Sequence, residues 1–187
     1  SVSMSAIRSV LIVGGGTAGW LAACHLAKKL MAAAPDGVQV TLLESADIPT
    51  IGVGEGTVPA MRQSLQYLGI SETEFIQRCD VTFKQSIKFV DWVHGPASAQ
   101  PDYYHHIFDY PELNRLDLTP YWLQGVLGEQ SYADAVSIQS RLADAGFAPK
   151  TMLHGEFQGL TSYAYHLDAA KFAALLTEHA TQKLGVK

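Results

Sequence analysis

The sequence predicts an α/β fold built around a parallel β-α-β unit, and three segments support this prediction. Ser9–Val13 is a short apolar run typical of a strand, Thr17–Met31 has helical composition without proline, and Val38–Leu43 is a second apolar run. Two successive strands joined by a helix are expected to run parallel, because this connection is the crossover unit of α/β proteins. The intervening residues 32–37 are expected to form an extended helix end and a turn.

The turn between the first strand and the helix has the glycine spacing of a dinucleotide-binding loop. Gly14, Gly16 and Gly19 form the pattern G-x-G-x-x-G. In that pattern the glycines permit a tight turn, close approach of a pyrophosphate, and close packing of helix on strand. The helix N-terminus near Thr17 offers free N–H donors to the phosphates. Glu44, which ends the second strand, can accept hydrogen bonds from an adenosine ribose. We therefore predict an FAD/NAD(P)-binding Rossmann-like fold, with a glycine-rich turn that binds nothing as the alternative.

Composition and charge narrow the classes of protein. The 187 residues are 48% hydrophobic and 17% charged, which is typical of one globular domain with a sizeable core. A formal net charge of −5 without a basic cluster argues against nucleic acid as a partner. Residues 10–27 carry no Asp, Glu, Lys or Arg, but their glycines argue against a membrane span. Since the start lacks a signal-peptide pattern, a cytoplasmic location is expected.

Neither the cysteines nor the histidines have the spacing of a metal site. Cys24 and Cys79 are the two cysteines, and they form no metal motif and no disulfide framework. Cys24 falls within the first predicted helix, where it is expected to be buried. The sequence therefore predicts no bound metal.

A glycine-dense loop follows the second strand and is expected to lie near the cofactor. It covers residues 45–59. Residues 81–92 alternate between apolar and polar, which predicts a single strand with Val81, Phe83, Ile87 and Phe89 on its buried face and Gln85 as the exception. The other expected elements are helices over 59–68, 71–78, 118–128, 132–145 and 169–184, a loop over 93–101, an extended segment over 102–110 and a strand over 162–166.

The flanks of the last helix have clear start and stop signals. Asp168 precedes it as an N-cap, and Gly185 follows it. A helix of this class should lead into another strand, yet the sequence reaches Lys187 at that point. We therefore expect residues 1–187 to be the N-terminal part of a nucleotide-binding domain in a longer protein. Residues 1–6 are expected to be a disordered start or a tag remnant.

Four stretches carry a resemblance to a known family. They are GGGTAGW at residues 14–20, IPTIGVGEGTVP at 48–59, FKQSIKFVDW at 83–92 and SYAYHLDA at 162–169. In their order and spacing they resemble the flavin-dependent halogenases of the tryptophan halogenase family. The match spans nearly the whole chain, and its second and third stretches are the most specific.

The resemblance implies an oxidoreductase that halogenates an electron-rich aromatic ring such as tryptophan or another indole. In the family, reduced FAD reacts with oxygen to give a flavin hydroperoxide, which chloride or bromide attacks to give hypohalous acid. A tunnel leads this acid to the substrate, where a lysine directs it onto the ring. The resemblance also implies a separate flavin reductase, a transient partner that supplies the reduced FAD.

The resemblance assigns roles to individual positions. Lys84 matches the catalytic lysine, and the loop 50–59 matches the strap that lies over the flavin. His106 and Phe108 match the aromatic residues that sandwich the substrate ring, although a slip of one residue would exchange His106 with His105. The positions that match the FAD-binding residues are Gly14, Gly16, Thr17, Ala18, Gly19, Glu44, Ile51, Gly52 and Val53.

Two chemical roles for Lys84 remain open. Its ammonium could donate hydrogen bonds to hypohalous acid, or its neutral amine could carry the halogen as a chloramine. The pattern alone places Lys84 on the same polar face as Lys88, which is expected to be structural or solvated. Lys88 is therefore the natural control.

Parts of the family pattern are absent from this sequence. The tryptophans are Trp20, Trp92 and Trp122, so the family's Trp-x-Trp-x-Ile-Pro motif is not among these residues. The glutamate that works beside the lysine, the halide-binding loop and the second half of the flavin site are not found either. This chain alone is therefore expected to be inactive.

The alternatives to a halogenase are a flavin-dependent aromatic monooxygenase and a non-catalytic nucleotide-binding fragment. The sequence determines neither the substrate, nor the halide preference, nor the oligomeric state.

Overall fold

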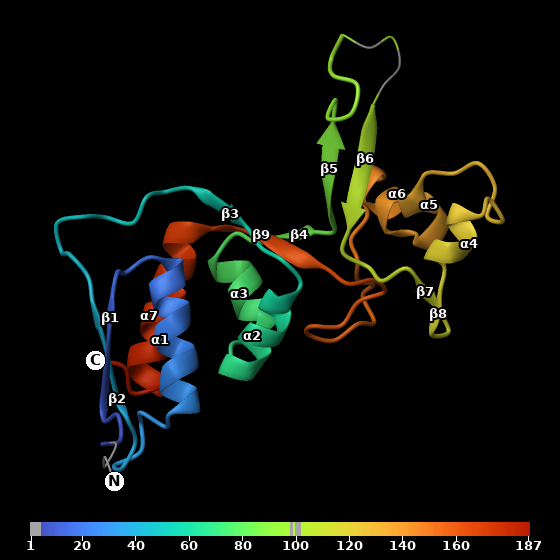
Figure 1. The fold of residues 1–187 in the computed structure, drawn as a ribbon. Helices are drawn as coiled ribbons and strands as arrows, with labels where there is room; N and C mark the ends of the chain where they lie inside the picture. The colour runs from blue at the N-terminus through green and yellow to red at the C-terminus, as the bar shows by residue number, and fades with distance from the viewer. Residues whose placement is uncertain (1–4, 98, 100–101) are drawn as a thin grey trace. The chain divides into compact units, whose positions relative to one another are not determined.

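The fold is that of a computed structural model, which describes residues 5–97, 99 and 102–187 (Figure 1). The chain divides into two compact units. The first contains the residues up to 55, together with 63–82 and 166–187, and the second contains 56–62 and 83–165. The start expected over residues 1–6 and the loop expected over 93–101 lie partly outside the described residues.

The first unit contains the predicted β-α-β unit. Strand β1 (Ser9–Val13) leads into helix α1 (Thr17–Lys29), and strand β2 (Gln39–Leu43) follows. The two strands pair in parallel over their whole length. The N–H of Gly14 donates to the carbonyl of Leu43 at 2.9 Å, which holds the glycine turn against the end of β2. The parallel crossover predicted from the sequence is thus confirmed.

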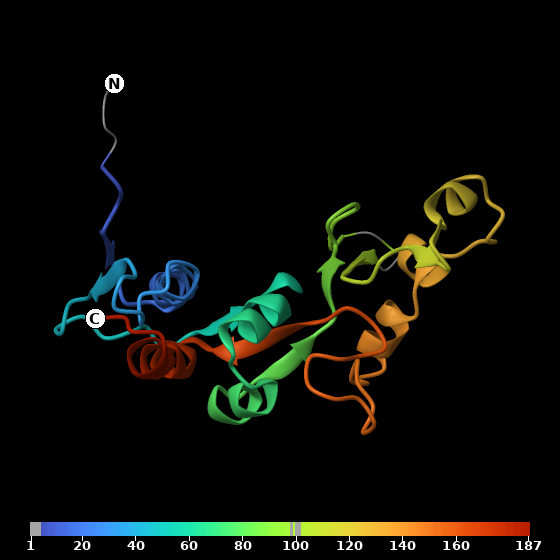
Figure 2. The same cartoon turned by 90° about the horizontal axis from the view of Figure 1, so that it is seen from below.

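Helix α7 (Ala169–Lys183) lies beside α1 in both views (Figures 1 and 2). The Asp168 side chain caps it by accepting the N–H of Lys171 at 3.0 Å, as predicted. After the helix, the N–H of Lys187 donates to Val40 O at 3.0 Å, and the N–H of Leu42 donates to Lys187 O at 2.8 Å. These two bonds have the pattern of a parallel ladder. The chain therefore returns to the edge of β2 after the helix, as a crossover requires.

Apolar side chains between the helices form the core of this unit. Helix α3 (Glu72–Arg78) packs against α7, and the fully buried rings of Phe75 and Phe172 meet edge to face at 5.0 Å. Helix α2 (Ala60–Leu68) precedes α3, and the imidazole of His179 donates to the carbonyl of Leu68 at 2.6 Å. The Ser71 hydroxyl caps α3 by accepting the N–H of Glu74 at 3.2 Å.

A three-stranded sheet has the order β3-β9-β4, and the chain passes between the units within these strands. They are β3 (Gly54–Gly56), β4 (Thr82–Lys84) and β9 (Ala164–Asp168). Residues 45–59 are therefore not loop throughout, because β3 bonds to the edge of β9.

The single strand predicted over residues 81–92 is wrong. Strand β4 ends at Lys84, and β5 (Ser86–Val90) belongs to another sheet, where it pairs antiparallel with β6 (Tyr103–Ile107). The break falls at Gln85, which is 8% exposed and donates its Nε2 to the carbonyl of Phe147 at 2.6 Å. The predicted apolar face is interrupted as well, since Ile87 is exposed. The chain changes sheets at Gln85, and the alternation therefore does not describe one face.

The helices predicted over 118–128 and 132–145 are also interrupted. Helix α4 (Thr119–Leu123) ends before two glycines in the left-handed region, at 125 and 128. Helices α5 (Tyr132–Val136) and α6 (Gln139–Asp144) are separated by Ser137, whose backbone is extended. A short hairpin of β7 (Glu112–Leu113) and β8 (Leu116–Asp117) was not predicted. Within the described ranges, none of the helices has the length and apolar character that a bilayer crossing requires.

Candidate functional site

A cavity of about 770 Å³ in the first unit opens at the carboxyl ends of β1 and β2. The glycine turn, the first residues of α1 and the segment 48–55 line it. Of the predicted cofactor positions, it is lined by Gly14, Gly16, Thr17, Ala18, Glu44, Ile51 and Val53. Ligands of open α/β sheets bind at this end of the strands. Gly52 borders a neighbouring cavity, and Gly19 lies inside the helix–strand contact.

The three fingerprint glycines have different surroundings. The backbone of Gly14 is in the left-handed region, with φ at +121°. A Cβ placed on Gly16 would have no described heavy atom within 4 Å, whereas a Cβ on Gly19 would lie 1.9 Å from the carbonyl oxygen of Gly14. Space is therefore free where a pyrophosphate would approach, and it is filled where the helix packs on the turn.

The N-terminus of α1 faces this cavity, and no acidic side chain of the helix itself neutralises its positive dipole end. Gly16 is the N-cap, and among the described residues it has no side-chain cap and no acidic residue follows in the first turn. The first N–H groups of a helix lack intrahelical partners and attract anions. The site thus offers N–H donors and a positive dipole end to phosphate groups.

Two carboxylates lie at the rim of the glycine turn. Thr17 Oγ1 donates to the two carboxylate oxygens of Glu55 at 2.8 and 3.1 Å. The Glu44 carboxylate lies against Gly15, since a Cβ on Gly15 would fall 1.5 Å from Glu44 Oε2. Glu55 belongs to the strap and was not assigned a role from the sequence. In the structure it bonds to the fingerprint helix from 38 residues away, and no local pattern encodes that partner.

The second unit brings the three predicted catalytic and substrate residues together. Lys84 Nζ donates to the carbonyl of Thr57 at 2.9 Å and lies 5.4 Å from the centroid of the Phe108 ring. The rings of His106 and Phe108 meet edge to face at 6.4 Å. His106 also lines a cavity of about 370 Å³. Phe108 therefore lies near both Lys84 and His106, but the cavity that His106 lines is bordered by neither Lys84 nor Phe108.

His105 has different surroundings from His106. Its Nδ1 lies 2.7 Å from Ser86 Oγ, and its Nε2 lies 3.0 Å from Asp144 Oδ1. Its side chain is 5% exposed. The register that pairs His106 with Phe108 therefore leaves His105 in a polar cluster beside α6.

Lys88 belongs to this same polar cluster. Its ammonium lies 2.9 Å from Asp144 Oδ1 on the surface. The hydrogen bond from Lys88, followed by that from His105, holds the pKa of Asp144 below its ordinary value. The two lysines of the FKQSIKF stretch thus have different partners, a backbone carbonyl for Lys84 and a carboxylate for Lys88.

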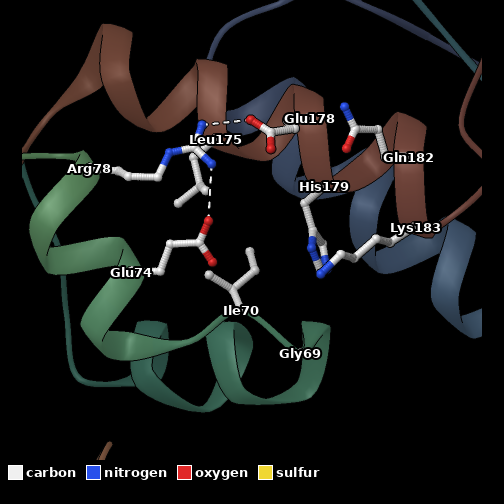
Figure 3. Close-up of a pocket in the computed structure, with 9 residues that line it drawn as sticks. All are labelled: Gly69, Ile70, Glu74, Arg78, Leu175, Glu178, His179, Gln182 and Lys183. Atoms are coloured by element: carbon white, nitrogen blue, oxygen red, sulfur yellow. Dashed lines mark hydrogen bonds and ion pairs between the residues drawn. The ribbon is translucent and has the colours of Figure 1, made fainter.

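A further hollow between α3 and α7 is too small for a cofactor, at about 40 Å³ (Figure 3). Arg78 crosses it and bonds to Glu74 at 3.0 Å and to Glu178 at 2.7 Å. The hydrogen bond from Arg78 lowers the pKa of Glu178. In the part of the chain that the structure describes, no three His, Cys, Asp or Glu residues gather as a metal site would require.

A parallel β-α-β unit with a glycine turn and an open cavity at its strand ends defines an α/β protein with a candidate ligand site at the carboxyl ends of its strands. More particularly, the chain belongs to the tryptophan halogenase family, whose sequence profile matches residues 9–187. The fold corresponds to the N-terminal third of flavin-dependent tryptophan halogenase structures.

Similar proteins support this assignment. Tryptophan 7-halogenase KtzQ of Kutzneria sp. (strain 744) is 37% identical over 96% of this chain and 35% of its own length. Tryptophan 7-halogenase RebH of Lentzea aerocolonigenes is 36% identical, over 97% and 35%. The crystal structure of a tryptophan halogenase from Shewanella frigidimarina is 46% identical with a TM-score of 0.87, over 97% and 35%. The chain thus spans about a third of the length of these relatives.

Proposed function

We propose that this chain is the N-terminal, FAD-binding portion of an enzyme that halogenates a small electron-rich aromatic substrate, such as tryptophan or a related indole. The co-substrates are oxygen and a chloride or bromide ion, and a separate flavin reductase provides the reduced cofactor. Two observations support this proposal: Phe108 lies near both Lys84 and His106, and a cavity of about 770 Å³ lies over the glycine fingerprint.

The residues around the cavity fit FAD. The open space over Gly16 and the free N-terminus of α1 suit a pyrophosphate. Glu44 lines the cavity and would accept hydrogen bonds from the ribose, while Ile51 and Val53 of the strap line it too and would contact the remainder of the cofactor. When bound, reduced FAD supplies the activation of oxygen that oxidises the halide.

Lys84 directs the oxidised halogen in this proposal. An ammonium has three N–H donors, and in the structure one of them is engaged by Thr57 O. The remaining donors would orient hypohalous acid and polarise it toward a substrate ring bound beside Phe108 and His106. Transfer through a chloramine instead requires the neutral amine.

The test uses the full-length enzyme, with Lys84→Ala and the matched control Lys88→Ala. We expect Lys84→Ala to abolish halogenation without loss of FAD binding, and Lys88→Ala to keep most of the activity because it removes a surface ion pair. The opposite pattern would overturn the assignment of Lys84. The mass of the product distinguishes a halogenase from an aromatic monooxygenase, since one adds halogen and the other oxygen.

A second candidate is a nucleotide-binding module without turnover. The observation in its favour is the cavity over the glycine turn, since nucleotide binding alone requires no catalytic residue. FAD titration of the 187-residue chain with a halogenation assay tests it. Binding without product supports the module, whereas halogenated product from the chain alone would exclude it.

A further inference from the structure

Gln139 is a fully buried side chain beside the predicted substrate residues. It is the first residue of α6, which lies next to β6 (Figure 1). The side chain is 0% exposed, and its Oε1 accepts two backbone N–H groups, those of Phe108 and Asp109, each at 2.7 Å. A buried amide is costly unless it is hydrogen-bonded, so these contacts fix its place.

The other end of the Gln139 amide is held as well. Its Nε2 donates to the carbonyl of Ser162 and to Thr161 Oγ1, the latter at 3.4 Å. Because the N–H groups of Phe108 and Asp109 need an acceptor and the Ser162 carbonyl needs a donor, the amide can face only one way. The side chain therefore links the segment after β6 to the segment before β9.

Phe108 depends on this link because it lies beyond the end of its strand. The ladder between β5 and β6 stops where Ser86 pairs with Ile107. The Phe108 N–H reaches the carbonyl of Gln85 only at 3.3 Å, whereas Gln139 Oε1 is closer, at 2.7 Å. Gln139 thus makes the shortest hydrogen bond to the Phe108 N–H, while the Asp109 carboxylate anchors the next residue by accepting from Ser137 Oγ at 2.9 Å and from the N–H of Ser162 at 3.4 Å.

We propose that Gln139 is a positioning residue for the aromatic substrate. It fixes the Phe108–Asp109 backbone, and so sets the Phe108 ring at 5.4 Å from the Lys84 ammonium. This inference rests on the proposed function, in which that ring orients the substrate relative to Lys84. Gln139 then affects which ring carbon is halogenated, although it touches neither the substrate nor the halogen.

The test compares Gln139→Met, which removes both acceptor and donor, with Gln139→Glu, which keeps an acceptor for the two N–H groups. Gln66→Met, at an exposed position of α2, is the matched control. The first readout is amide hydrogen exchange in the 187-residue chain. We expect exchange at Phe108 and Asp109 to become about tenfold faster in folded Gln139→Met, less so in Gln139→Glu, and to stay unchanged in the control.

The second readout is the ratio of product isomers formed by the full-length enzyme. A lost positioning contact broadens the range of ring positions that are halogenated, with partial rescue by Gln139→Glu. A merely structural role lowers the amount of active enzyme and leaves the isomer ratio unchanged. An unchanged ratio in folded Gln139→Met, or unchanged exchange at Phe108 and Asp109, would overturn the inference. If the unmodified enzyme forms no halogenated product, the proposed function fails instead, and the exchange rates still decide whether Gln139 holds Phe108.

Discussion

Alanine substitutions at two fingerprint glycines should affect different properties. Gly19→Ala should lower the stability of the fold, whereas Gly16→Ala should weaken FAD binding. A Cβ on Gly19 would lie 1.9 Å from the carbonyl oxygen of Gly14, a backbone atom that cannot rotate away. Real Cβ contacts do not fall below 3.0 Å, so the turn and α1 must separate by about 1 Å. Overpacking of this kind costs roughly 1–3 kcal/mol. We therefore expect Gly19→Ala to destabilise the fold.

The methyl group of an alanine at Gly16 would lie in open space. The φ of Gly16 is −76°, and a Cβ there would have no described heavy atom within 4 Å. Losing glycine at the N-cap costs roughly 0.5 kcal/mol, and the reduced entropy of the unfolded chain offsets roughly that amount. The stability of Gly16→Ala should therefore stay close to that of the unmodified chain. Its methyl group, however, takes the space that a pyrophosphate needs.

Thermal unfolding and FAD titration of the 187-residue chain separate these effects. With roughly 2–4 °C per kcal/mol for a chain of this size, Gly19→Ala should lower the Tm by roughly 2–12 °C, and Gly16→Ala by less than about 2 °C. Gly16→Ala should weaken FAD binding by roughly tenfold or more, because charge-assisted hydrogen bonds are lost. Equal losses of Tm, or undiminished FAD affinity in Gly16→Ala, would refute the reasoning.

Two further predictions concern titratable groups. Burial raises the pKa of the Cys24 and Cys79 thiols to about 11 each, so neither should react with a maleimide at pH 7 until denaturant unfolds the chain; rapid labelling of the native protein would contradict this. The Lys88 ammonium, with His105, lowers the pKa of folded Asp144. A lowered folded-state pKa stabilises the fold above the unfolded-state pKa, and this stability is lost as the pH falls through the folded-state pKa. Asp144→Asn should therefore lose less Tm than the unmodified chain as the pH falls below about 4. If the two proteins lose Tm equally over this range, Asp144 makes no such contribution.

The β-α-β unit and the ends of α7 could be predicted because their sequence signals are local. The glycine spacing, two apolar runs and one proline-free helix together specify the β-α-β unit, and each signal agrees with the next. The Asp168 cap and the glycine at 185 likewise fix the ends of α7 from neighbouring residues alone. The burial of Cys24 followed from its place within α1.

The second unit was harder because its elements are short and their partners are distant. The alternation over 81–92 resumes after its exception at Gln85, although the chain changes sheets there. What stabilises the break is a hydrogen bond to the carbonyl of Phe147, 62 residues later in the chain. Likewise, nothing around Gln139 in the sequence indicates that its amide binds the backbone at Phe108, 31 residues earlier.

The sequence by itself determined the family, the glycine turn and the kinds of residue that the chemistry requires. The resemblance assigned Lys84 and His106 rather than Lys88 and His105, but the alternating pattern alone places both lysines on one polar face and does not show what either face of the histidine segment contacts. Only the tertiary structure decided these partners. The change of sheet at Gln85 places Lys84 near Phe108, whereas Lys88 and His105 bond to Asp144. The physical reason is that the partners of a side chain are set by contacts between segments far apart in the chain, which local periodicity does not record.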